Sequence, residues 1–381
     1  MRVRTAFVIR LILSSGTRIL NLGQIPYMSS LTETAYYTRR IINWSILAVI
    51  GYVILRMMWG VAVNVYLTIF PPQAPPPNHA FGSLPPLSFP ISQASPSGQI
   101  IYQLQTIEGS IPTASVSANV YFMPKKGSSL LALSTAQAFA KRLGFVTTPI
   151  PEPANKNIYR FDDAGTQLRH LWYDIVTTNF VIQYDFQQDT GIFLNSKVPS
   201  FQEAKAEARN LLQTYNLYPE DIVGGEVRVT YYKVSESALI PVTSQSQADA
   251  VRVDFYRPNI ASTPVISGTS SGPISIVFSG SGNNKKRVLN FTYSYWPIDY
   301  QTVATYALKT SAQAWQELQG GGGYVLKYPS TPLITVRSVY LAYYDSASPQ
   351  TYLQPVFVFS GDDGFMAYVP AISQEFIEQK Q

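Results

Sequence analysis

A run of apolar residues near the N-terminus constrains the fold of this chain more than any other feature. Residues 41–70 read IINWSILAVIGYVILRMMWGVAVNVYLTIF, and Arg56 is the only formal charge among them. About 20 apolar residues suffice to cross the hydrocarbon core of a bilayer. We therefore expect a transmembrane helix over residues 41–66, with the membrane bilayer as its surroundings.

Arg56 is the one residue that opposes this interpretation. A helix that enters the bilayer at Ile41 places Arg56 roughly 24 Å along its axis, near the far boundary. There a long cationic side chain can reach the interface while its methylenes stay in the hydrocarbon. We interpret Arg56 as an interfacial residue rather than as a functional charge inside the membrane.

The distribution of charge predicts an orientation. The whole chain carries a net charge of +5, and the basic tail, residues 1–40, accounts for all of it with six arginines against one glutamate. Arginines beside an apolar segment favour the cytoplasmic side, so we expect a cytoplasmic N-terminus in the cell membrane and the rest of the chain outside. Residues 71–381 are nearly neutral, which argues against nucleic acid as a partner. Translation from Met1 or from Met28 fits equally well.

A proline-rich segment follows, PPQAPPPNHAFGSLPPLSFP over residues 71–90. Such a density of proline favours the extended polyproline II conformation. We interpret residues 67–98 as a linker, a semi-rigid stalk between the membrane and the remaining chain.

Three short helices are expected after the linker, each from a capping-box pattern in which the fourth residue reaches back to the first. The patterns begin at Ser134, Ser200 and Thr310, and each precedes an alanine-rich stretch that ends at a glycine, asparagine or proline. Strand-like composition surrounds them, with turns rather than helices between most of the runs. The eleven expected strands cover residues 100–106, 117–122, 168–174, 179–186, 226–234, 251–256, 274–278, 287–295, 334–344, 352–359 and 365–369.

These patterns predict an α+β fold, in which tandem units of a short helix pack on antiparallel sheet. We expect a first unit over residues 99–199, a second and β-rich unit over 200–299, a third over 300–373, and a tail over 374–381.

The segment IQYDFQQDTGIF, residues 182–193, follows a capped helix and resembles PepSY-type domains. The order of short tail, one span and tandem units is similar to membrane-anchored accessory regulators of a cell-wall sensor kinase. TETAYYTRR, FGSLPPLSFP and YLQPVFVFSG with AYVPAI resemble uncharacterised single-pass proteins of candidate-phylum bacteria. The resemblance implies a non-catalytic domain that binds a peptide or protein, or modulates a peptidase or a kinase.

Motifs of catalysis and metal binding are weak in this chain. GTSSG, residues 268–272, matches a nucleophile elbow, but a strand-like run follows it where that elbow needs a helix. His170 lies in an expected strand, and GDDG at residues 361–364 is typical of a tight turn. There is no cysteine, which excludes disulfides and thiol nucleophiles. We expect no catalytic residue, no metal site and no cofactor.

The aromatic runs near the C-terminus carry the candidate binding residues. In residues 339–344 and 352–359 both faces of the expected strands are apolar, so both faces of their sheet should be covered. The helix with Trp315 can cover one face, and a neighbouring unit or a partner must cover the other. We expect tyrosine hydroxyls at the margin to contact an envelope protein or peptide. The candidates are Tyr340, Tyr343, Tyr344, Tyr352 and Tyr368. The alternatives are a structural or attachment surface protein and a cell-wall hydrolase.

Overall fold

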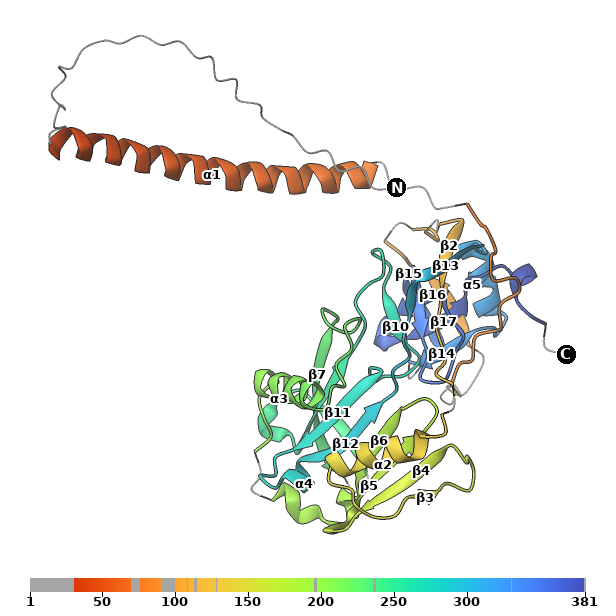
Figure 1. Cartoon of the computed structure of the whole chain (residues 1–381). Helices are drawn as coiled ribbons and strands as arrows, with labels where there is room; N and C mark the ends of the chain where they lie inside the picture. Colours follow the sequence, from red (N-terminus) through yellow and green to blue (C-terminus); the bar gives the residue numbers. More distant parts are fainter. Residues whose placement is uncertain are drawn as a thin grey trace, which may run out of the picture. The chain divides into compact units, whose positions relative to one another are not determined.

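The computed structural model describes residues 31–69, 76–90 and 100–379, except 108, 113–114, 128, 195–196, 236–237 and 330. The chain divides into two compact units, Met1–Gln73 and Ala74–Gln381 (Figure 1). Each unit is described by itself.

The first unit contains helix α1 (Leu31–Ile69). Its stretch Arg39–Val63 is long enough and apolar enough to cross a membrane. Every side chain described in α1 is exposed, including Trp44 and Trp59. One apolar helix of the predicted kind therefore precedes the sheets, and it begins and ends outside the predicted bounds of 41–66.

The second unit contains a nine-stranded sheet in which all neighbouring strands are antiparallel. Two strands at its middle, β6 (Phe180–Tyr184) and β12 (Val288–Tyr293), pair and join two halves that come from different parts of the sequence. The order along the sheet is β3 (Ile150–Pro151), β4 (Ile158–Asp163), β5 (Thr166–Asp174), β6 (Phe180–Tyr184), β12 (Val288–Tyr293), β11 (Ile274–Ser279), β9 (Ala250–Phe255), β7 (Val227–Ser235) and β8 (Ala238–Val242).

Two helices, α2 (Ala132–Arg142) and α3 (Phe201–Thr214), pack on this sheet in one shared core (Figure 1). Most of their buried positions are alanines, fully buried at 136, 140, 204 and 208, so each helix lies close to the strands. Large rings from the sheet fill the core between them. The rings include Phe180, Phe255, Phe278 and Phe291.

The capping patterns of the sequence hold for two helices of three. Ser200 forms a complete capping box with Glu203, and Thr310 forms one with Gln313 at the start of α5 (Ser311–Gln319). The third prediction is wrong, because α2 begins at Ala132 and Ser134 lies inside it, where its hydroxyl donates to the Leu131 carbonyl. Leucine and alanine before Ser134 are good helix formers and extend the helix upstream of the motif.

An eight-stranded sheet holds the C-terminal strands. Its central path is β1 (Ile101–Leu104), β15 (Leu333–Asp345), β16 (Tyr352–Gly361), β17 (Met366–Pro370) and β14 (Tyr324–Lys327). β10 (Val265–Ser267) pairs with β15, and β2 (Ser117–Phe122) pairs with β16 and with β13 (Asp299–Ala307). Only β1 and β10 run parallel to their partner, so the predicted α+β class with antiparallel sheets is confirmed.

Short helices complete the described residues. They are α4 (Asn284–Arg287) and the single 3₁₀ turns η1 (Phe186–Gln188), η2 (Thr190–Phe193), η3 (Gln245–Gln247), η4 (Asp362–Gly364) and η5 (Gln374–Phe376). The division into three units stays a prediction. The strands of 99–199 and 200–299 share the nine-stranded sheet, while β1, β2 and β10 pair with strands of 300–373.

Both faces of the C-terminal sheet are covered, and the proline-rich segment covers one of them. Helix α5 packs on the first face, with the rings of Trp315 and Phe359 5.7 Å apart. On the second face Phe89 stacks on Tyr324 at 5.3 Å. Leu84 of the same segment is fully buried in the core of the first face, and it bridges to Ile377. The interpretation of the whole segment as a free stalk is therefore wrong for residues 76–90, because their apolar side chains pack on the sheet.

A buried arginine joins the two sheets of this unit. Arg257 follows β9, and its Nε donates to Asp345 Oδ2 at the end of β15 over 2.7 Å. Its other nitrogens donate to the Asp221 carboxylate and to the Trp296 carbonyl. The Arg257 side chain has no exposed surface, and that of Asp345 is 3% exposed.

The charges of this network perturb each other. Burial alone would lower the pKa of Arg257, but the carboxylates of Asp345 and Asp221 outweigh it and raise that pKa. Burial raises the pKa of Asp345, and the Arg257 guanidinium offsets only part of that increase. The cation therefore holds two carboxylates, one of them fully enclosed, where the two sheets meet.

Candidate functional site

A cleft of about 250 Å³ opens between α2 and α3, over the line where β6 pairs with β12. Strands from both halves of the sheet form its floor, and the end of α2, the face of α3 and α4 form its walls. Its lining residues are Leu143, Arg169, Ile182, Glu207, Leu211, Tyr215, Phe278, Asn284, Arg287, Val288 and Phe291.

The floor of the cleft is apolar and rigid. Ile182, Phe278 and Phe291 are each at most 2% exposed and belong to the core that α2 and α3 share with the sheet. Leu211 on α3 and Tyr215 at its C-cap are partly exposed. The position of the floor is therefore fixed by the same packing that holds the domain together.

Three consecutive bases of α4 each bind a carboxylate from a different segment, and the last of them, Arg287, lines the cleft. Arg287 makes a bidentate pair with Glu207 of α3, at 2.6 and 2.7 Å. The neighbouring ion pairs are Lys285 with Asp163 at 2.6 Å and Lys286 with Asp189 at 2.7 Å. Asp189 belongs to the Asp-Thr-Gly turn in the segment that resembles PepSY-type domains. Its ion pair with Lys286 joins this turn to the other half of the sheet.

Arg169 forms the polar end of the cleft. Its Nη1 donates to Asp163 Oδ2 at 3.1 Å and to the Leu143 carbonyl at 3.2 Å, and its guanidinium lies 4.3 Å from the centre of the Phe145 ring. Burial opposes ionisation of Asp163, but hydrogen bonds from Lys285, the Gly165 amide and Arg169 lower its pKa. Asp163 is thus an anion shared by two cations.

The five predicted binding tyrosines lie mostly in the core. Tyr343, Tyr344 and Tyr368 are at most 5% exposed, and the Tyr368 hydroxyl donates to the Ser267 carbonyl at 3.2 Å. Burial raises the pKa of Tyr344 to about 12. The expectation of exposed hydroxyls is wrong for these three. The proline-rich segment and β10 cover Tyr344 and Tyr368 on one face of the sheet, and Tyr343 packs with Tyr121 and Trp296 on the other. Tyr340 and Tyr352 are half-buried, and a binding role for any of the five stays a prediction.

The weak motifs of the sequence have structural roles. GTSSG connects β10 to β11, so strands lie on both sides of it. His170 Nδ1 lies 2.7 Å from Asp162 Oδ1 within the sheet. Asp362 of the GDDG turn pairs with Arg337. Among the residues that the structure describes, no three His, Asp or Glu side chains gather as a metal would need.

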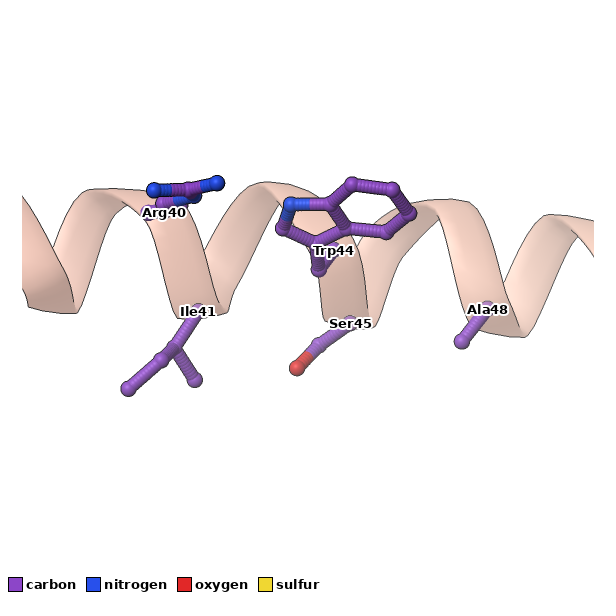
Figure 2. Close-up of a pocket in the computed structure, with 5 residues that line it drawn as sticks. All are labelled: Arg40, Ile41, Trp44, Ser45 and Ala48. Atoms are coloured by element: carbon purple, nitrogen blue, oxygen red, sulfur yellow. The ribbon is translucent and has the colours of Figure 1, made fainter.

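A hollow also lies along α1, on one side of the single helix, and Figure 2 shows the residues that line it. They are Arg40, Ile41, Trp44, Ser45 and Ala48. All come from two turns of one helix. Such a surface is typical of a segment that meets lipid or another helix, and it is not an enclosed site.

Sequence reasoning missed the cleft and its residues. Arg169 and Glu207 are 38 positions apart, and Arg287 lies 80 positions beyond Glu207. The basic run NNKKR after a glycine-rich turn was the one available signal, because clustered bases need carboxylate partners in a nearly neutral domain.

No family model and no curated protein sequence matches the chain. Among solved structures, an uncharacterized protein from Eubacterium rectale ATCC 33656 is 12% identical, covering 67% of this chain and 82% of its own, with a TM-score of 0.36. The Bacillus megaterium YpeB C-terminal domain is also 12% identical, covering 68% of this chain and 97% of its own, with a TM-score of 0.29. Scores this low do not establish a shared fold.

The described residues have a definite architecture. One helix that is long and apolar enough to span a membrane precedes an α+β unit of two sheets. The larger sheet carries a cleft with an apolar floor and a charged rim.

Proposed function

We propose that this chain is a membrane-anchored, extracytoplasmic and non-catalytic ectodomain that binds a protein or peptide partner and acts as a regulator at the cell envelope. The observation that carries the proposal is the cleft between α2 and α3. A concave site with an apolar floor and a few convergent polar groups is the usual form of a ligand site. The basic and acidic side chains at and beside the cleft form ion pairs with one another. This arrangement supports a binding role rather than a catalytic one.

The anchoring part of the proposal is supported by α1 and by the arginines at positions 39 and 40. Because the chain has no cysteine, single introduced cysteines report orientation without background. Lys156→Cys places a thiol on the exposed surface of the second unit, and Thr34→Cys places one near the start of α1. In intact cells, a membrane-impermeant maleimide should label position 156 and leave position 34 unlabelled. The reverse pattern would refute the orientation.

The binding part is tested by comparing two variants on the same helix. Leu211→Glu puts a carboxylate into the cleft, whereas Gln213→Glu puts one on the exposed side of α3. The full-length wild type and Gln213→Glu should co-purify with the same partner, and Leu211→Glu should lose it at equal expression. Identical partner sets for all three proteins would refute the cleft as the binding site.

The alternatives make different predictions. A structural or attachment protein would keep its associations when the cleft is filled, because it would use an outer surface. A cell-wall hydrolase would release soluble fragments from purified cell wall, and loss of that activity in a Leu211→Glu protein would make the cleft an active site instead.

A further inference from the structure

Arg169 has a hydrogen-bonding group that the protein does not use. The residue is 9% exposed, and its Nε is buried without a hydrogen-bond partner among the described residues. Only its Nη1 donates, to Asp163 and Leu143. An unsatisfied buried donor costs free energy, so the guanidinium is incompletely paired inside the protein. The part of this group that lines the cleft can donate to an anion there.

The charges around this guanidinium leave a positive surplus. Arg169 and Lys285 share the single carboxylate of Asp163, whereas Arg287 and Glu207 neutralise each other. Among the charged residues that line the cleft, Arg169, Arg287 and Glu207, positive charge likewise exceeds negative charge by one. A carboxylate is one of the anions whose oxygens match the planar donors of a guanidinium, and it is the one that every polypeptide carries at its C-terminus.

The remaining wall accepts an apolar group of limited size. Leu143, Ile182, Leu211, Phe278, Val288 and Phe291 line it. A volume of about 250 Å³ lies below the roughly 300–1,000 Å³ of pockets that enclose whole drug-sized ligands. The space suits a single apolar side chain next to the carboxylate.

We propose, building on the binding function above, that this cleft captures the C-terminal residue of a partner polypeptide. The terminal carboxylate binds at Arg169, and an apolar last side chain, such as leucine, isoleucine or phenylalanine, fills the space over Phe278 and Phe291. The rest of the partner leaves along the groove between α2 and α3. Capture of a free C-terminus is a known mode of peptide recognition.

The test uses matched peptide pools and the full-length protein in nanodiscs. Each pool contains fluorescein-labelled heptapeptides with six randomised positions and a last residue of Leu, Ile or Phe. One pool ends in a free carboxylate and the other in a carboxamide. In fluorescence anisotropy, the protein should bind the acid pool at least about tenfold more tightly than the amide pool, because the amide lacks the negative charge.

Variants of Leu211 test the location without disturbing the buried ion pairs. Leu211→Trp fills the cleft, and Leu211→Glu repels the carboxylate. Both variants should bind the acid pool about tenfold or more weakly than the wild type does. Gln213→Glu adds the same charge outside the cleft and should bind like the wild type. Arg169→Gln should abolish the difference between acid and amide, and the two Leu211 variants keep the test decisive where this variant does not fold.

Decanoate and N-acetyl-leucine serve as competing probes. Displacement of the acid pool by N-acetyl-leucine at high concentration supports capture of a terminal residue, whereas decanoate binding without peptide binding would assign the cleft to a lipid acid and overturn the inference. Equal affinity for acid and amide pools, or unchanged affinity in both Leu211 variants, would also overturn it. Those results would leave the wider binding function standing, because the co-purification experiment reads partner association whatever end of the partner is bound.

Discussion

Replacing Arg257 with methionine should destabilise the second unit more than any other single removal of a charge in the described residues. The side chain is fully buried between the two sheets and donates to Asp345, Asp221 and the Trp296 carbonyl. Methionine keeps much of the volume and removes every donor. The Asp345 carboxylate then stays in the interior without a cation.

The magnitude follows from that uncompensated charge. Removing one partner of a buried ion pair typically costs about 3–5 kcal/mol, out of a total stability of about 5–15 kcal/mol for a domain. We expect Arg257→Met to lose about 3–5 kcal/mol and to lower Tm by roughly 5–15 °C. Adding Asp345→Asn should restore about 1–3 kcal/mol, because the stranded charge is gone.

The pH dependence has a definite sign. Burial raises the pKa of Asp345 above its ordinary value of 3.8, so the ionised form is the one that folding disfavours. In Arg257→Met, stability should fall as pH rises from that ordinary value through the raised pKa, and return as pH is lowered. The difference in the free energy of unfolding between Arg257→Met and the wild type should therefore be smaller at pH 5 than at pH 7.5.

The assay is thermal melting of the full-length protein in detergent, with unfolding monitored by tryptophan fluorescence. Trp296, one of five tryptophans in the chain, lies beside Arg257 and is 7% exposed, so it contributes to the fluorescence change when this junction unfolds. Arg228→Met is the matched control, since its pair with Glu226 is more than half exposed on both sides and contributes at most about 1 kcal/mol. If Arg257→Met lost no more stability than this control, or if adding Asp345→Asn restored none of the lost stability, that result would refute the reasoning.

Further predictions concern helix caps, the proline-rich segment and metals. Thr310→Ala removes a complete capping box and should cost about 1 kcal/mol in thermal melts, whereas Ser134→Ala, inside α2, should change Tm little; equal losses would contradict the assignment of the caps. Leu84→Ala should cost about 2–5 kcal/mol because Leu84 is fully buried, and the exposed Pro86→Ser should cost almost nothing; a neutral Leu84→Ala would mean that the segment is not packed. EDTA should leave Tm unchanged, and a large decrease would reveal a bound metal.

The long-range pairing of the strands could not be predicted from the sequence, although most strands could. All eleven expected runs contain a strand, because alternating β-branched and aromatic residues between turn residues are a strong local signal. The missed strands have mixed composition. β13 begins Asp-Tyr-Gln-Thr around a bulge, and β8 contains Pro241 at the edge of its sheet.

The cover of the aromatic runs shows a second limit. Two apolar faces correctly indicated a sheet covered on both sides, and Trp315 of α5 does cover one of them. The composition of the proline-rich segment indicated an extended chain, but it could not indicate that Phe89 packs on the other face or that Leu84 packs in the core beside α5. Proline fixes the backbone of such a segment, whereas the apolar residues between the prolines determine whether it stays free.

Residue-specific photocrosslinking in cells tests the central claim most directly. A photoreactive amino acid in place of Leu211 faces the cleft, and the same amino acid in place of Gln213 faces away from it on the same helix. The account predicts a reproducible crosslink from position 211 to one partner polypeptide, with no equivalent product from position 213. Absence of a polypeptide crosslink at 211, or the same products at both positions, would contradict it.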